Sequence, residues 1–299
     1  MKRIIIICGI LIGLLSAGDI PFDAYRAFTY LEKQVAFGPR VPGSPGQIIC
    51  RDWLVEQSKM YADTVIIQHY KAYRPDNKTT VDAYNIIARF NPGNPKRVML
   101  STHWDTRPIS DKDFVYYNTP VPGANDGASG TAVLLELIKH IENIAPDIGV
   151  DVVFWDAEDM GIAGNGKYFC QGSQYYAENP ILPLAEKGIL IDMIGDKDLE
   201  IPIEANSMRY APGLVNEVWD IAKELGYEQV FRKQIGNDIY DDHISLNIKA
   251  GIPTIDIIDF HYHYKGKNIW HTPRDLPAHC SPQSLQYIGD VLYTWLSRQ

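Results

Sequence analysis

Short strand-like runs alternate along the chain with stretches in which apolar residues recur at helical spacing. The strand-like runs, rich in β-branched and aromatic residues, lie at residues 64–70, 85–90, 97–102, 151–156, 188–194 and 254–258. Apolar residues recur every three to four positions, as on one face of a helix, at residues 25–35, 48–61, 131–141, 214–225 and 283–296. Such alternation is typical of a sheet covered by helices on both faces. We therefore predict the α/β class, with a mixed, mostly parallel central sheet.

Composition and charge narrow the class of protein. The chain has 299 residues, of which 45% are hydrophobic and 22% charged, so a sizeable core can be buried without disulfides. Residues 19–299 contain no internal repeat, low-complexity tract or polar linker, which favours a single domain. The net charge is −9, and no stripe of basic residues is present that could bind the phosphates of a nucleic acid. We expect no nucleic-acid partner, and we expect a monomer.

The first residues have the pattern of an export signal. Lys2 and Arg3 precede a continuous apolar run at residues 4–15, and small residues follow at 16–18. An uncleaved membrane anchor is the alternative, but the run is short of the roughly 20 residues that cross a bilayer. We therefore expect residues 1–18 to be a signal peptide and no stable membrane span. Residues 19–299 would then be a periplasmic or secreted catalytic domain.

The cysteines do not predict a metal site. Removal of residues 1–18 would leave Cys50, Cys170 and Cys280, which are widely separated and form no Cys-x-x-Cys pair. One disulfide could form in an oxidising compartment. The same residues could equally be small core side chains, and the sequence leaves both alternatives open.

Acidic and histidine residues gather where the predicted strands end. In an α/β sheet these ends and the loops after them form the usual ligand-binding edge. The residues concerned are His103, Asp126, Glu158, Asp159, Asp192, Asp241 and His271. Each has an ordinary explanation when taken alone: Asp126 could cap a helix, and the Glu158–Asp159 pair could be a solvated turn. Their coincidence at successive strand ends favours a common site.

Two carboxylates and one imidazole are a ligand set expected for Zn²⁺ with an open fourth position, which marks a catalytic metal. Two adjacent acids at a strand end cannot both point the same way. Glu158 and Asp159 can therefore have different roles, because one can bind a metal while the other stays free as a general base.

Five segments resemble the zinc aminopeptidase (M28-like) superfamily, which includes the animal-type glutaminyl cyclases. They lie in family order at residues 122–130, 154–159, 190–195, 241–244 and 270–272. The resemblance implies that Asp126, Asp159 and His271 hold the catalytic zinc and that Glu158 is the general base. Relatives often have glutamate where this chain has Asp159, which is shorter by one methylene group.

The resemblance covers two activities, cyclase and aminopeptidase. Two-zinc aminopeptidases use the residues that match His103 and Asp192 for a second metal, with the residue that matches Asp126 as a bridge. Animal-type glutaminyl cyclases keep similar residues and bind one zinc. Asp241 before an Asp-His pair and Trp270 before the ligand histidine both resemble the cyclases. The segment 160–171, in contrast, lacks the aromatic pocket residues of animal cyclases.

Interpretation of the chain as a glutaminyl cyclase implies that it converts N-terminal glutamine, in peptides or proteins, to pyroglutamate with release of ammonia. It implies one zinc as Lewis acid, Glu158 as the proton carrier, and Asp192 and Asp241 as its hydrogen-bond partners. Trp270 would line the substrate pocket. The alternative is a secreted zinc aminopeptidase that hydrolyses N-terminal residues, with a second zinc held by His103 and Asp192. A non-catalytic module would have lost Glu158 or a ligand, and this chain has lost neither.

Overall fold

The computed structural model describes residues 20–162, 164 and 166–299. The predicted signal peptide at residues 1–18 lies outside the described residues and stays a prediction. Within the described part of the chain, no helix combines the length and apolar character that crossing a membrane requires.

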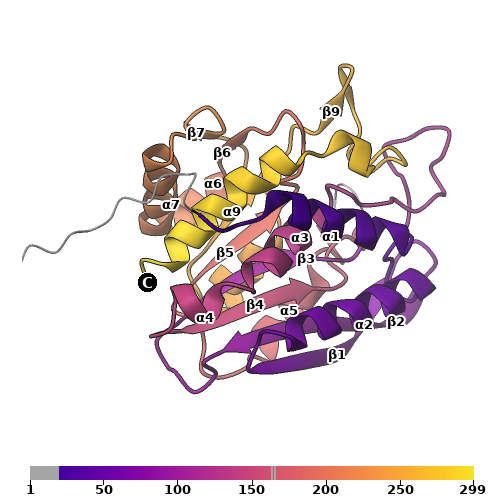
Figure 1. The fold of residues 1–299 in the computed structure, drawn as a ribbon. Coiled ribbons are helices and arrows are strands. Elements are labelled where there is room, and N and C mark those ends of the chain that lie inside the picture. Colours follow the sequence, from indigo (N-terminus) through magenta and orange to yellow (C-terminus); the bar gives the residue numbers. More distant parts are fainter. Residues whose placement is uncertain (1–19, 163, 165) are drawn as a thin grey trace, which may run out of the picture.

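A six-stranded sheet forms the centre of the molecule (Figure 1). Its strands stand in the order β1-β2-β4-β3-β5-β8. Their bounds are β1 Thr64–Arg74, β2 Thr79–Phe90, β3 Arg97–His103, β4 Gly149–Trp155, β5 Lys187–Asp192 and β8 Thr254–Ile258. β1 and β2 form an antiparallel hairpin at one edge, and β2 also pairs antiparallel with β4. The pairs β3–β4, β3–β5 and β5–β8 are parallel. The predicted mixed, mostly parallel sheet is confirmed.

Helices cover both faces of this sheet. Helices α1, α3 and α9 lie side by side across one face, with α2 beside them over the β1–β2 hairpin (Figure 1). The helical bounds are α1 Ala24–Ala36, α2 Pro45–Lys59, α3 Ala128–Leu137, α4 Ile141–Ile144, α5 Gln171–Glu178, α6 Ala205–Tyr210, α7 Pro212–Glu224, α8 Asp242–Ser245, the π-helix Leu246–Ala250, the 3-10 helix Pro277–His279 and α9 Pro282–Leu296. Four short strands complete the described elements: β6 Ile201–Ile203, β7 Phe231–Ile235, β9 His263–Tyr264 and β10 Lys267–Asn268.

Residues 152–155 of strand β4 show why the central strands are mostly apolar in sequence. Successive side chains point to opposite faces of a sheet. Val152 and Phe154 enter the core beneath α1, α3 and α9, whereas Val153 and Trp155 enter the core on the other face. There, Trp155 packs edge-on against Tyr176 of α5, with ring centroids 5.3 Å apart. Both faces are buried, so no polar alternation remains in the sequence.

Several helices and strands begin or end at residues other than those predicted from the sequence. Helix α2 begins at Pro45 rather than residue 48, because Ser44 caps it and accepts a hydrogen bond from the backbone N–H of Gln47. Proline is well suited to the first helical position, where no N–H partner is needed. Strand β2 begins at Thr79 rather than residue 85. Its first residues are polar and largely exposed, so the apolar pattern marks only its buried second half.

A buried ionic cluster joins β2, β3 and β4. The Asp151 carboxylate accepts hydrogen bonds from Arg89 Nε at 2.8 Å and from Arg97 Nη2 and Nε at 2.8 and 3.0 Å. All three residues are buried. Charges without water must pair with one another, so each arginine depends on this carboxylate.

Replacing Asp151 by alanine should therefore lower the free energy of unfolding by about 3–5 kcal/mol, since two buried guanidinium groups lose their partner. Denaturant unfolding of both proteins measures the difference. Asp220→Ala is the matched control, because Asp220 pairs with Lys233 on the exposed surface, and a change of under about 1 kcal/mol is expected there. Equal effects of the two substitutions would contradict the assigned role of Asp151.

Candidate active site

The predicted site residues meet at the carboxyl ends of the parallel strands. His103 is the last residue of β3, Asp192 is the last residue of β5, and Glu158 and Asp159 follow β4 after a short bend. The carboxyl ends of neighbouring parallel strands lie at one edge of a sheet. Residues that are far apart in sequence are thereby brought to one place.

The loop before α3 holds Asp126 in a fixed position. Its backbone N–H and that of Asn125 both donate to the Asp275 carboxylate, at 3.1 and 2.7 Å. Arg40 donates to two carbonyl oxygens of the same loop. Gly127, with φ +99°, starts the helix in a conformation that side chains rarely adopt, and a Cβ there would lie 2.5 Å from a backbone oxygen. The N-cap of α3 is Gly127, so the explanation of Asp126 as a helix cap is wrong.

Asp126, Asp159 and His271 form a group of metal-ligand type, with one ligand atom of each lying within 4.8 Å of the others. His271 Nε2 lies 3.3 Å from Asp159 Oδ1 and 3.5 Å from Asp126 Oδ2. Ligands bound to tetrahedral Zn²⁺ at about 2.0–2.1 Å stand roughly 3.3 Å apart. All three residues are buried, and Oδ2 of each aspartate has no hydrogen-bond partner among the described residues. Buried carboxylate oxygens need a partner, and a zinc ion fits this set.

A second layer of residues orients these groups. Asp111 Oδ1 accepts from His271 Nδ1 at 3.1 Å, which directs Nε2 of the imidazole toward the two aspartates. Arg107 donates to both oxygens of Asp111 and also to Asp159 Oδ1 at 2.8 Å. Although burial opposes the change, the hydrogen bonds from His271 and Arg107 lower the pKa of Asp111. A carboxylate behind a metal-binding histidine fixes its tautomer and ring orientation.

Replacing Asp111 by alanine is expected to weaken zinc binding about 10–100-fold, because the imidazole loses its orienting partner. Competition with a chelator measures the affinity. The matched control is Asp113→Ala in the same loop. Asp113 accepts from the backbone N–H of Val115 and Tyr116, whereas the partner of His271 is Asp111. If the chelator removes zinc from both variants and from the unmodified protein at the same concentration, Asp111 does not support the metal.

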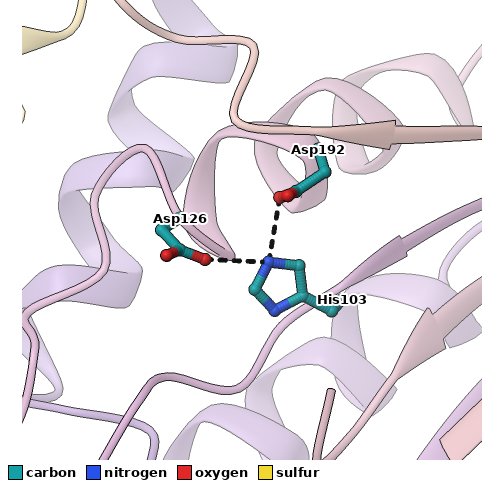
Figure 2. Close-up of side chains that lie close together, drawn as sticks. All are labelled: His103, Asp126 and Asp192. Atoms are coloured by element: carbon teal, nitrogen blue, oxygen red, sulfur yellow. Dashed lines mark hydrogen bonds and ion pairs between the residues drawn. The ribbon is translucent and has the colours of Figure 1, made fainter. Parts of the chain in front are cut away.

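His103, Asp126 and Asp192 form another group, in which the three side chains point toward one another (Figure 2). His103 Nε2 lies 2.9 Å from Asp192 Oδ1 and 3.2 Å from Asp126 Oδ1. Although burial opposes it, the charge of Asp192 and hydrogen bonds to the carboxylates raise the pKa of His103. The His103 imidazole thus lies at hydrogen-bond distance from both carboxylates.

Glu158 does not belong to the zinc-type group, although it lines the same pocket. The Asp105 carboxylate accepts from the backbone N–H of Glu158 and Asp159, at 3.0 and 3.2 Å, and fixes the bend. Ala157, the residue before the pair, has φ +57°. The two adjacent acids thus diverge, and Glu158 Oε1 accepts a hydrogen bond from Cys170 Sγ at 3.3 Å. Burial, together with the nearby charge of Asp241, raises the pKa of Glu158.

Asp192 and Asp241, expected beside Glu158, have other hydrogen-bond partners. Asp192 Oδ1 is bonded to His103, and Asp241 Oδ1 accepts from the backbone N–H of Asp242 at 2.5 Å. One oxygen of Asp241 lies within 4.8 Å of a Glu158 oxygen and of Cys170 Sγ. Both aspartates line the same pocket as Glu158. The expected proximity to the pocket is found, whereas their direct hydrogen bonds to Glu158 stay a prediction.

A pocket of about 480 Å³ opens over the site and is lined by the zinc-type group, Glu158 and several aromatic rings. Trp270 stacks on His271, with ring centroids 3.6 Å apart, and packs against Phe260 at 4.8 Å. Phe169 and Tyr240 also line the pocket. Phe169 belongs to the segment 160–171, so this segment supplies one aromatic side chain to the pocket.

The sequence left two explanations for the cysteines, and the structure decides between them. Cys50, Cys170 and Cys280 are buried and free, so no disulfide joins these three residues. Cys50 belongs to the main hydrophobic core. Cys170 differs from it, because its sulfur contacts a candidate catalytic group. Asp105, Arg107, Asp111, Cys170 and Asp275 are site residues to which the sequence assigned no role.

Comparison with known proteins shows which family this chain belongs to. Residues 85–296 match the model of peptidase family M28. An aminopeptidase of Bacillus subtilis is 28% identical over 225 residues, which cover 72% of this chain and 44% of the relative. This chain therefore spans less than half the length of that aminopeptidase. A bovine glutaminyl-peptide cyclotransferase is 24% identical over 294 residues, covering 86% of this chain and 77% of the relative.

Solved structures of similar proteins align with nearly the whole chain. A Zn-dependent exopeptidase from Parabacteroides distasonis is 38% identical, with a TM-score of 0.88 over 93% of this chain and 99% of the other. A glutaminyl cyclase from Bacteroides thetaiotaomicron, bound to N-acetylhistamine, is 36% identical, with a TM-score of 0.88 over 93% of this chain and 98% of the other. Both activities are therefore represented among similar structures.

Proposed function

Because the chain belongs to peptidase family M28, we propose that it is a zinc-dependent glutaminyl-peptide cyclotransferase. It converts the N-terminal glutamine of peptides or proteins to pyroglutamate and releases ammonia. The observation that carries the proposal is the position of the two residues that resemble the cyclases, Trp270 and Asp241. Both line the pocket together with Glu158, and Trp270 stacks on His271 with ring centroids 3.6 Å apart.

Asp126, Asp159 and His271 would hold the zinc, since one ligand atom of each lies within 4.8 Å of the others and each aspartate has one oxygen without a hydrogen-bond partner among the described residues. A bound zinc acts as a Lewis acid that polarises a carbonyl group. Arg107 and Asp111 keep the ligands in place during turnover. Glu158 lies outside this set, so its carboxylate stays available for proton transfer.

Glu158 moves the proton that the reaction requires. The substrate α-amine attacks the carbonyl carbon of the side-chain amide (Cδ) of the same glutamine, a C–N bond closes the five-membered ring, and the bond from Cδ to the amide nitrogen breaks. Glu158 Oε1 accepts from Cys170, which leaves Oε2 to take a proton from the amine and return it to the departing nitrogen as ammonia forms. The nucleophile belongs to the substrate, so no water is consumed.

The aromatic wall orients the substrate. Trp270, Phe169 and Phe260 line the pocket beside Glu158. Flat apolar rings can pack against the methylene groups of a glutamine side chain and exclude water from the γ-amide. Exclusion of water favours cyclisation over hydrolysis, because the bound amine is then the nearest nucleophile.

The second candidate function is a zinc aminopeptidase. It is favoured by the convergence of His103, Asp126 and Asp192 into a metal-type group and by the similarity to an exopeptidase. In that case Glu158 would activate a water molecule, and the first peptide bond would break. Incubation with a Gln-initiated peptide separates the two functions by mass spectrometry. Loss of one ammonia from an otherwise intact peptide supports the cyclase, and release of free glutamine rejects it.

Asp241 provides a test that is specific to the cyclase. Replacing it by alanine should lower the rate of cyclisation about 10–100-fold, because Glu158 loses a neighbour that shares its proton. Ammonia release from a Gln-peptide measures the rate. Asp238→Ala is the matched control, since Asp238 lines the same pocket and is exposed. Unchanged turnover in Asp241→Ala would remove Asp241 from the mechanism.

We also propose that residues 1–18 direct export and that residues 19–299 form the catalytic domain, which acts as a monomer in the periplasm or outside the cell. Support comes from the charged and apolar pattern of the first residues. Sequencing of the N-terminus of the exported protein tests the cleavage point.

A further inference from the structure

A third group of metal-ligand type lies beside the zinc-type group. Glu158, Cys170 and Asp241 each place one ligand atom within 4.8 Å of the others. Cys170 Sγ lies 3.3 Å from Glu158 Oε1. None of the three residues belongs to the set that would hold the catalytic zinc. Among the described residues, neither Cys50 nor Cys280 takes part in such a group.

Asp241 is the residue that points to a missing ligand. It is 4% exposed, and its Oδ2 has no hydrogen-bond partner within the described part of the chain. A buried carboxylate oxygen without a partner is energetically unfavourable. Glu158 and Asp241 both line the pocket, so an ion that enters the pocket can reach them. Cys170 is fully buried in contact with Glu158 and adds a sulfur to the two carboxylates.

The spacing suits a metal that accepts both sulfur and oxygen. Zinc binds thiolate sulfur at about 2.3 Å and carboxylate oxygen at about 2.0–2.2 Å, so sulfur and oxygen ligands of one tetrahedral ion stand roughly 3.5 Å apart. The Cys170–Glu158 distance of 3.3 Å is close to this value. Thiolate ligands select zinc and similar soft ions over magnesium or calcium.

We propose that Glu158, Cys170 and Asp241 form an inhibitory site for a second, thiophilic divalent ion, such as cadmium or excess zinc. Binding forms one metal–sulfur and two metal–oxygen bonds, and the proton of the thiol is released to water. No oxidation or reduction takes place. The bound ion occupies the carboxylate of Glu158, which then cannot carry a proton. This inhibitory consequence rests on the proposed function of Glu158, whereas the binding itself does not.

Cadmium binding tests the site without any substrate. The zinc-loaded protein is titrated with Cd²⁺, and the ultraviolet charge-transfer band of a cadmium–thiolate bond is recorded. The catalytic set has no sulfur, so exchange of cadmium into it gives no band. We expect a band that saturates at one equivalent, is lost in Cys170→Ala and is kept in Cys50→Ala. A titration without a band, or an equal band in Cys170→Ala, would overturn the proposal.

Inhibition of the enzyme by excess zinc provides a second test of the site. The activity of each protein is compared with its own activity before excess zinc is added, so any effect of the substitution on turnover cancels. In Cys170→Ala the inhibiting zinc concentration should rise at least about tenfold, because one of three ligands is gone. Magnesium should inhibit neither protein. Equal sensitivity of both proteins to zinc would overturn the inhibitory role. If no Gln-peptide is cyclised, a band that depends on Cys170 still supports the site, and only the proposed function fails.

Discussion

Glu158→Gln is expected to lower kcat for cyclisation by about 10²–10⁴-fold, the usual contribution of a positioned proton carrier. Glutamine has nearly the same shape and can still accept the hydrogen bond from Cys170, but it cannot take a proton from the α-amine. Glu158 lies outside the zinc-type group, so the zinc content should stay unchanged. The KM for a Gln-peptide should change little, since the aromatic wall of the pocket is intact. Steady-state kinetics with metal analysis of the same sample measure all three quantities.

The control for this experiment is Glu56→Gln. It makes the same chemical change on the exposed surface of α2, and full activity is expected. A Glu158→Gln protein that turns over at the normal rate would exclude Glu158 as the proton carrier. Loss of zinc from this variant would instead make Glu158 a metal ligand, which contradicts its assigned position.

His271→Ala is expected to abolish zinc binding and to lower cyclisation by at least about 10³-fold, because a Lewis acid supplies several kcal/mol of the catalysis. The imidazole is the nitrogen ligand of the set, and Asp126 and Asp159 alone leave two like charges side by side. A chelator should have the same effect on the unmodified protein, and added zinc should restore its activity. Elemental analysis and the ammonia-release assay measure the two effects.

His103→Ala is the matched comparison, since both substitutions remove a buried histidine that contacts Asp126. If one zinc is bound by His271, the His103→Ala protein keeps its zinc while the His271→Ala protein loses it. Two zinc ions in the unmodified protein, with one lost in His103→Ala, would favour the aminopeptidase.

The fold could be predicted from sequence because burial on both faces leaves a visible pattern. Residues 152–155 of strand β4 are continuously apolar because Val152 and Val153 enter opposite cores. The less regular elements were harder to foresee. The first residues of β2 face water and carry no apolar signal, and short α5 and α6 lack enough turns for a clear period.

The candidate site could be predicted only in part. Its strand-end residues were found because chain order fixes which edge of a parallel sheet they reach. Asp111 was missed, since its contact with His271 bridges 160 positions in sequence between two irregular loops. Cys170 was missed for a similar reason, because a buried cysteine looks the same in sequence whether it packs in a core or contacts Glu158. Such contacts depend on loop conformations that have no period to detect.

The most direct test of the account is a zinc-edge anomalous difference map from crystals of the purified protein. We predict one peak, bonded at about 2.0–2.2 Å to Asp126, Asp159 and His271, with the Glu158 carboxylate unbonded beside it. A second zinc peak between His103 and Asp192, or no peak among the three predicted ligands, would contradict the account.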